Sequence, residues 1–127
     1  MLTTTSSFSS FSINDINAAK TFYSNVLGLI VTEQEGMGLT IQLPGGGSAF
    51  AYSKPDHKPA TFTILNFAVE NIDKGVDELK EAGVQFEQYD GEMKTDEKGI
   101  ARSPSPDKGP DIAWFKDPSG NILSILH

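Results

Sequence analysis

The chain has no cysteine, one tryptophan and only two histidines among its 127 residues. The absence of cysteine excludes disulfide frameworks, thiolate zinc sites, iron–sulfur clusters and a cysteine nucleophile. It also fits a reducing compartment, so we expect a cytoplasmic protein. Long apolar runs are lacking too, since no stretch approaches the roughly 20 residues of a membrane-spanning helix. The first residues have neither the basic region nor the apolar segment of a secretory signal, and we expect no membrane partner.

Basic residues are scarce relative to acidic ones. The chain has 10 lysines and arginines against 17 aspartates and glutamates, a net charge of −7. Nucleic-acid binding depends on neutralising phosphates with basic side chains, so the charge balance predicts no nucleic-acid partner. The simplest role of the negative charge is to keep the protein in solution.

What the sequence does contain is a pattern that occurs twice. Residues 11–19, Phe-Ser-Ile-Asn-Asp-Ile-Asn-Ala-Ala, return as residues 67–75, Phe-Ala-Val-Glu-Asn-Ile-Asp-Lys-Gly. In both copies a strand precedes a helix-capping residue, Asp15 or Asn71, and a glycine follows the helix at Gly28 or Gly83. Such a repeat predicts two copies of one supersecondary unit.

The segments between these motifs complete each unit. Alternating apolar residues and turn residues predict three further strands after each helix, the second set beginning with a strand over 84–89. We therefore predict an α+β fold of two βαβββ modules in a single domain over 1–127. Module 1 covers about 8–53, a proline-marked connector covers 54–60, and module 2 covers about 61–127. Residues 90–110 form a long, charged loop, which we expect to be functional or mobile.

Three motifs, in this order, resemble the vicinal oxygen chelate superfamily, also called the glyoxalase/bleomycin-resistance/dioxygenase fold. They are residues 11–23 with Val26-Leu-Gly-Leu, residues 67–73 with Leu79-Lys-Glu-Ala-Gly-Val, and Phe115-Lys-Asp-Pro-Ser-Gly-Asn. The resemblance implies that the paired modules curl into a cup-shaped mixed sheet with the helices on its outer face. It also implies a small-molecule site in the cup and a homodimer. Many members hold a divalent metal with four side chains, one on each of four cup strands.

The resemblance places these four metal positions at Phe8, Ala51, Ile64 and Ser124, with Phe50 and Tyr52 as strand neighbours of the second. Divalent metals need imidazole, carboxylate or amide oxygen donors, which none of the four residues supplies. The two histidines, His57 and His127, lie on the connector and at the terminus, away from the predicted strands. We therefore expect no metal in the family site and no other cofactor.

Strand alternation predicts which side chains face the cup. Neighbouring residues of a strand point to opposite faces of the sheet. The alternation sends an apolar set toward the helices and a mixed apolar and polar set into the cup, as is typical of small-molecule sites. The sole tryptophan is included because an aromatic ring facing the cup would stack on a ligand. The candidate ligand-binding residues are Phe8, Ser10, Ser12, Ala51, Phe62, Ile64, Asn66, Trp114, Ile122 and Ser124.

The first functional hypothesis is a metal-free protein that binds an unidentified small molecule in the cup, similar in plan to the antibiotic-sequestering members. A metal-dependent glyoxalase-like lyase or isomerase, or a ring-cleaving dioxygenase, is the alternative. A third is a metal-free enzyme in which Asn66, the serines or a tyrosine polarise a carbonyl. A fourth is a non-catalytic partner module. Whether the protein is an enzyme stays open at this point.

Overall fold

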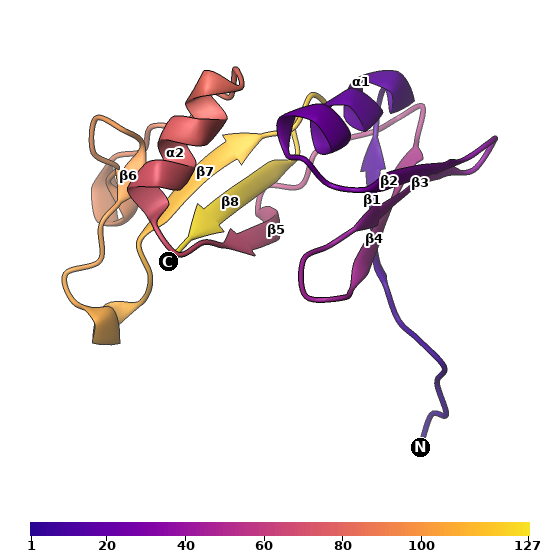
Figure 1. Ribbon diagram of the computed structural model, residues 1–127, viewed down its shortest axis with the longest axis horizontal. Coiled ribbons are helices and arrows are strands. Elements are labelled where there is room, and N and C mark those ends of the chain that lie inside the picture. The colour runs from indigo at the N-terminus through magenta and orange to yellow at the C-terminus, as the bar shows by residue number, and fades with distance from the viewer. The chain divides into compact units, whose positions relative to one another are not determined.

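The computed structural model describes residues 1–127, which divide into two compact units, Met1–Lys58 and Pro59–His127. The boundary lies inside the connector predicted at 54–60. Each unit contains one α-helix and one four-stranded sheet (Figure 1). This confirms the α+β class and the two βαβββ modules, whereas the assignment of both modules to a single domain stays a prediction.

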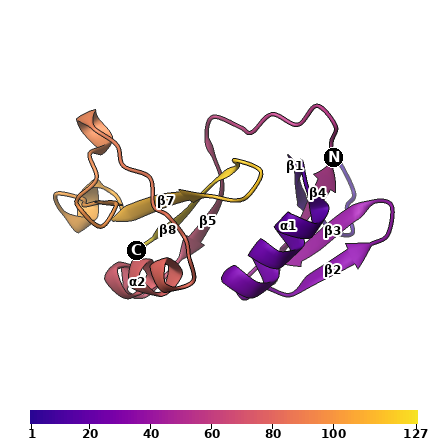
Figure 2. The ribbon, with the colours of Figure 1, turned by 90° about the horizontal axis from the view of Figure 1, so that it is seen from above.

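Sheet A, in the first unit, has the strand order β1-β4-β3-β2. β1 runs parallel to β4, and the other neighbours are antiparallel. Helix α1 contacts β3 (Figure 2). The strands are β1 (Ser9–Ile13), β2 (Val31–Gln34), β3 (Gly38–Gln42) and β4 (Ser48–Ser53).

The helical segment of the first unit begins and ends where the sequence predicts. The Asp15 carboxylate accepts a 3.0 Å hydrogen bond from the Ala18 amide and so caps α1 (Ile16–Thr21). The segment continues as the wider turn η1 (Phe22–Val26), in which the Leu27 amide donates to the Phe22 carbonyl at 3.0 Å. Gly28 follows with a φ of +69°, a left-handed conformation that favours glycine and ends the helix.

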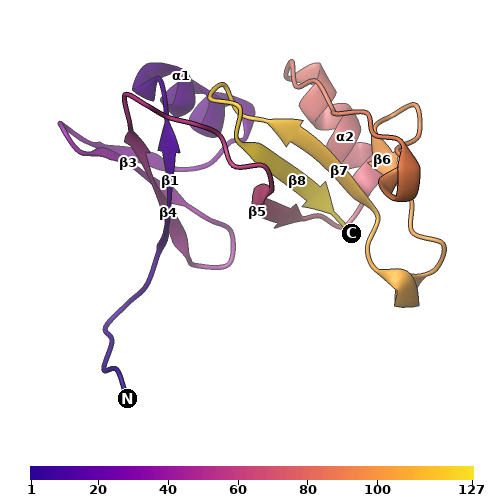
Figure 3. The same ribbon diagram turned by 180° about the vertical axis from the view of Figure 1, so that it is seen from behind.

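Sheet B, in the second unit, has the strand order β5-β8-β7-β6, with β5 parallel to β8. Asn71 caps α2, which contacts β7 and β8 (Figure 3). The elements are β5 (Thr63–Ala68), α2 (Ile72–Glu81), η2 (Gly91–Met93), β6 (Ile100–Ala101), η3 (Pro106–Lys108), β7 (Ile112–Lys116) and β8 (Ile122–Leu126). No helix combines the length and the apolar composition needed to cross a bilayer.

The strand predicted over 84–89 is wrong. Phe86 forms only an isolated bridge to Phe115. The chain then leaves β7. The Tyr89 amide donates to the hydroxyl of Thr95 at 3.0 Å, so this side chain takes the place of a backbone carbonyl of a neighbouring strand. The loop predicted at 90–110 contains the two short helices and β6.

Candidate ligand-binding faces

Each sheet has one face that packs under its helix and one that does not, called here the helix side and the open face. In sheet A the helix side is apolar: Ile13, Leu39 and Ile41 are fully buried. Phe11 points the same way, since its ring lies 5.8 Å from the ring of Tyr23 in η1. The alternate residues of β1 therefore form the open face.

The open face of sheet A holds two adjacent pairs of a serine and an aromatic residue. The register sets Ser10 beside Phe50 and Ser12 beside Tyr52. The two rings are nearly parallel, at 19°, with centroids 6.4 Å apart. Phe8 precedes β1 and is 64% exposed. The predicted positions of Ser10 and Ser12 on one face are thus consistent with the register, and their role in binding stays a prediction.

Ala51 does not lie on this face. It pairs with Phe11 and with Leu39 and is fully buried on the helix side. The expectation that Ala51 faces the ligand is wrong, because the glycine loop before β4 does not fix the register by itself. A shift of one residue turns a side chain to the other face. The side chains of β4 that lie on the open face are instead those of its neighbours Phe50 and Tyr52.

A histidine joins the open face of sheet A from the connector. Nδ1 of His57 lies 2.6 Å from Oγ of Ser12. The His57 amide donates to the Lys54 carbonyl at 3.0 Å, which closes a turn with Pro55 at its second position. The expectation that His57 lies away from the strands is therefore wrong.

Two features of the sequence could have located His57. A βαβββ module runs its first and last strands in parallel, so β1 and β4 end side by side, and the Lys54 amide extends this ladder to the Ile13 carbonyl at 3.0 Å. The Pro-Asp pair after Lys54 favours a tight turn. Together they return the connector to the end of β1, where Ser12 lies.

The open face of sheet B is organised around Ser124. Its side chain is fully buried, and its hydroxyl donates to Oδ1 of Asn66 at 2.5 Å. The register sets Ser124 between Asn66 on β5 and Trp114 on β7. Ile122 lies two residues before Ser124 on the same face of β8. Four of the predicted residues thus share one face: Asn66, Trp114, Ile122 and Ser124.

The first half of β5 departs from the predicted alternation. Pairing with β8 shifts by one residue between Thr63 and Leu65, so Thr63 is in register with Ile122. Ile64 occupies the irregularity, and Phe62 precedes the strand with 67% of its surface exposed. Strand alternation therefore does not predict which way Ile64 and Phe62 face.

Trp114 has an aromatic neighbour, Tyr89, in the segment before η2. The ring of Tyr89 meets it edge to face, with centroids 5.4 Å apart and planes at 70°. Burial, and to a smaller degree the Glu87 carboxylate, raises the pKa of the Tyr89 hydroxyl above its ordinary value. Tyr89 is thus a neutral group able to donate a hydrogen bond beside Trp114.

The donor groups on the two open faces are hydroxyl, amide, phenol and imidazole groups. No group of three or more histidine, aspartate or glutamate side chains is arranged to hold a metal ion in the structure. These donors can orient a polar ligand group, and the rings of Phe50, Tyr52 and Trp114 can pack on an apolar one.

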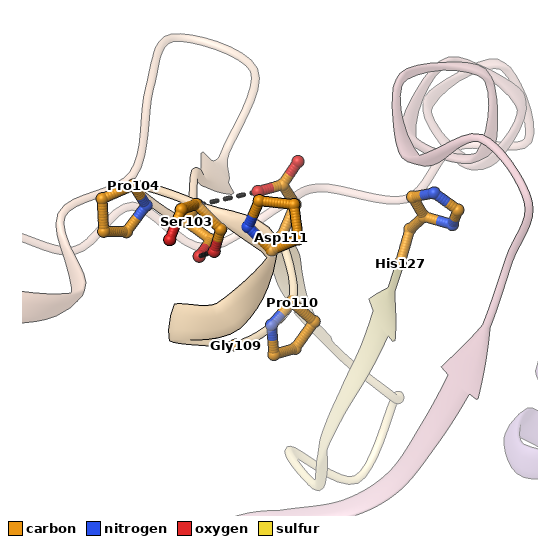
Figure 4. A pocket seen from close by; sticks show the side chains of 8 residues that line it. Ser103, Pro104, Gly109, Pro110, Asp111 and His127 are labelled. Carbon is orange, nitrogen blue, oxygen red and sulfur yellow. Dashed lines mark hydrogen bonds between the residues drawn. The ribbon is translucent and has the colours of Figure 1, made fainter.

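Two hollows lie away from the predicted residues. The larger, of about 670 Å³, is lined by the segments 103–106 and 109–111 and by His127 (Figure 4). Asp111 shapes it by accepting the Ser103 amide at 2.7 Å. The smaller surrounds the start of α2, from Val69 to Glu78. Neither includes a residue of the open faces.

The chain matches the sequence model of the Glyoxalase/Bleomycin resistance protein/Dioxygenase superfamily over residues 8–125. No curated protein sequence matches the chain. Among solved structures, TnmS3, an antibiotic binding protein from Streptomyces sp. CB03234, is 23% identical with a TM-score of 0.70, covering 99% of this chain and 97% of its own. A superfamily member from Sphaerobacter thermophilus is 20% identical with a TM-score of 0.72, covering 99% and 98%. Another glyoxalase/bleomycin resistance protein from Streptomyces sp. CB03234 is 22% identical with a TM-score of 0.65, covering 97% and 100%.

Proposed function

Because the chain belongs to the glyoxalase/bleomycin resistance protein/dioxygenase superfamily, we propose that it binds a small, largely apolar molecule against its open sheet faces without a metal ion. The observation that carries the proposal is the composition of these faces. Aromatic rings stand beside single hydroxyl and amide groups, as in the pair Ser12–Tyr52. In sheet B, the exposed amide of Asn66 lies in the same row as Trp114, with the buried Ser124 between them. Such a surface packs on an apolar ligand and orients it through a few hydrogen bonds.

The strand positions that carry metal ligands in relatives support the metal-free part of the proposal. Phe8, Ile64 and Ser124 supply a phenyl group, an alkyl group and a hydroxyl that already binds Asn66. Ala51 and its open-face neighbour Phe50 have no donor atom, and the other neighbour, Tyr52, offers only a phenol. A divalent metal would lack the imidazole and carboxylate ligands that it prefers.

The similarity to TnmS3, described as an antibiotic binding protein, supports an antibiotic or a molecule of similar chemistry as the ligand. We further propose that the protein acts as a homodimer in the cytoplasm. Sedimentation equilibrium of the untagged protein tests the dimer, and a mass of one chain, 13.7 kDa, at all concentrations would contradict it.

Elemental analysis tests the absence of a metal. Untagged protein, purified without chelator, is offered Zn²⁺, Ni²⁺, Mn²⁺ and Fe²⁺, and its melting temperature is followed with each. We expect well under one metal ion per chain and no shift. About one ion per chain with a higher melting temperature would show binding to the native state and would overturn the proposal.

A metal-free enzyme is a second candidate, favoured by the Ser12–His57 hydrogen bond of 2.6 Å. A hydroxyl within reach of an imidazole is the arrangement that activates serine nucleophiles and transfers protons. Turnover of carbonyl, ester or epoxide substrates by chelator-treated protein tests it. Activity that survives both Ser12→Ala and His57→Gln would exclude the pair as its source.

A further inference from the structure

The open face of sheet A combines an aromatic platform with one polar anchor. Phe50 and Tyr52 form the platform, with ring planes at 19° and centroids 6.4 Å apart. Ser12 is the register partner of Tyr52, and its hydroxyl lies 2.6 Å from Nδ1 of His57. The anchor therefore lies at one edge of the platform, and the hydrogen bond holds the imidazole in one orientation.

The two units differ in charge. Residues 1–58 contain three lysines and four carboxylates, a net charge of −1, whereas residues 59–127 contain seven basic and 13 acidic residues, a net charge of −6. Nearly all of the net negative charge of the protein thus belongs to residues 59–127, the unit that lacks the Ser12–His57 pair.

The few carboxylates of the first unit lie off the open face. Asp15 caps α1, and Glu33 is on the helix-side register of β2, where it binds Lys20 at 3.2 Å. Glu35 lies in the turn after β2, at the far edge of the sheet from β1. The open-face residues of the four strands carry no charge, namely Ser10, Ser12, Thr32, Gln34, Gly38, Thr40, Gln42, Ser48, Phe50 and Tyr52.

The connector adds positive charge beside the anchor. Lys54 and Lys58 flank His57 in sequence, and both are exposed. Asp56 is the one carboxylate among them; its side chain is 80% exposed and lies 3.9 Å from the Lys54 amine. An anion at the Ser12–His57 pair would meet a hydrogen-bond donor and a net positive segment, and hydrogen bonds to a charged group are the stronger ones.

We propose that the open face of sheet A selects an aromatic molecule that bears an anionic group, such as an aromatic carboxylate or sulfonate. The ring system packs on Phe50 and Tyr52, and the anion accepts a hydrogen bond from the Ser12–His57 pair. The assignment rests on the proposed small-molecule binding and adds to it the chemical class of the ligand. Ser12 and His57 act here as ligand-binding residues.

Two fluorescent dyes that differ in one group test the assignment. 1-Anilinonaphthalene-8-sulfonate carries an anionic group, and N-phenyl-1-naphthylamine is the same ring system without it. The dissociation constant of each dye is measured by fluorescence titration of the full chain. We expect the anionic dye to bind about tenfold more tightly.

Variants assign this preference to the anchor. His57→Gln keeps a hydrogen-bonding side chain but removes the basic group, and we expect it to reduce the preference to about twofold or less. His57→Lys places a positive charge at this position, and we expect it to recover part of the preference that His57→Gln loses. His127→Gln, in the second unit, is the matched control and should leave the preference unchanged. Melting temperatures of all variants show that each is folded.

The outcomes separate the two proposals. If both dyes bind with equal affinity, or if His57→Gln keeps the full preference, the anionic class is overturned while small-molecule binding stands. If neither dye binds to the folded protein, both proposals are contradicted. Loss of the preference in His57→Gln, with partial recovery in His57→Lys, supports the anchor.

Discussion

Ser124 carries a hydroxyl group in a fully buried position, and Asn66 is its partner at 2.5 Å. Asn66→Ala would leave the buried hydroxyl without an acceptor, so we expect it to lower the free energy of unfolding by about 1–3 kcal/mol. Ser124→Ala removes the hydroxyl itself, and water can reach the exposed Asn66, so its effect should be smaller.

Urea denaturation of the two single variants and of the double variant measures this difference. The double variant should be less destabilised than the two single effects added together, because each single change removes the same hydrogen bond. If Asn66→Ala were as stable as the unaltered protein, the account of Asn66 as the acceptor of the buried Ser124 hydroxyl would be contradicted.

Gly38 shows how closely β3 and β4 approach each other. A Cβ atom built at this glycine would overlap the carbonyl oxygen of Ala51 and lie 2.8 Å from the ring of Phe50. We expect Gly38→Ala to lower the free energy of unfolding by about 1–3 kcal/mol, the usual cost of overpacking. Gly47→Ala is the control, since its Cβ would meet no atom within 4 Å. Thermal unfolding of both variants is the test. A Gly38→Ala variant as stable as Gly47→Ala would contradict the close approach of β3 and β4.

Among the elements, β6 is flanked on both sides by residues that charged groups tie to α2. Arg102 donates to both Asp73 carboxylate oxygens, at 2.8 and 3.0 Å, and Nε of Arg102 donates to Asp96 at 3.1 Å. Lys98 bridges Asp73 and Asp77 at 3.1 Å each. The part of the 90–110 loop over 96–102 is therefore tied to the helix by these ion pairs.

This network predicts how stability depends on pH. Hydrogen bonds from Arg102, and then from Lys98, hold the pKa of the Asp73 carboxyl well below its usual range. Burial alone would raise the pKa of Asp96, but hydrogen bonds from the Ile100 amide and from Arg102 lower it overall. A carboxyl whose pKa is lower in the folded state stabilises the fold at neutral pH. That contribution is lost as the pH falls below the ordinary aspartate pKa of about 4.

We therefore expect Asp73→Asn to be less stable than the unaltered protein at pH 7 and closer to it in stability at pH 3. Urea midpoints measured from pH 7 to pH 3 test this, and Asp107→Asn, outside the network, is the control. A difference between Asp73→Asn and the unaltered protein that stays constant over the whole range would contradict the account.

The same elements show what the sequence can and cannot predict. Caps and terminating glycines are local signals, so the helices after Asp15 and Asn71 were predicted correctly. The facing of Ala51 depends on the register across a glycine loop, and the missing strand at 84–89 depends on Thr95, six residues further along than Tyr89. His57 reaches Ser12 over 45 residues of sequence. These three outcomes were decided by tertiary contacts that periodicity does not encode.

For the molecule as a whole, the repeat predicted the number and kind of modules, and the family match over residues 8–125 confirms the superfamily. The facing of the candidate residues was predicted better in the second module than in the first. Four residues there share one face, because strand alternation holds wherever the strand pairing is regular. The alternation fails at the irregularity around Ile64.

The most direct test of the central claim is an amide NMR titration of chelator-treated protein with N-phenyl-1-naphthylamine. The account predicts saturable shifts at open-face residues, including Ser12, Tyr52, Asn66 and Trp114, and no change of the spectrum when Zn²⁺ is added. Saturable shifts that appear only after a metal ion is supplied, or that gather on α1 and α2, would contradict it.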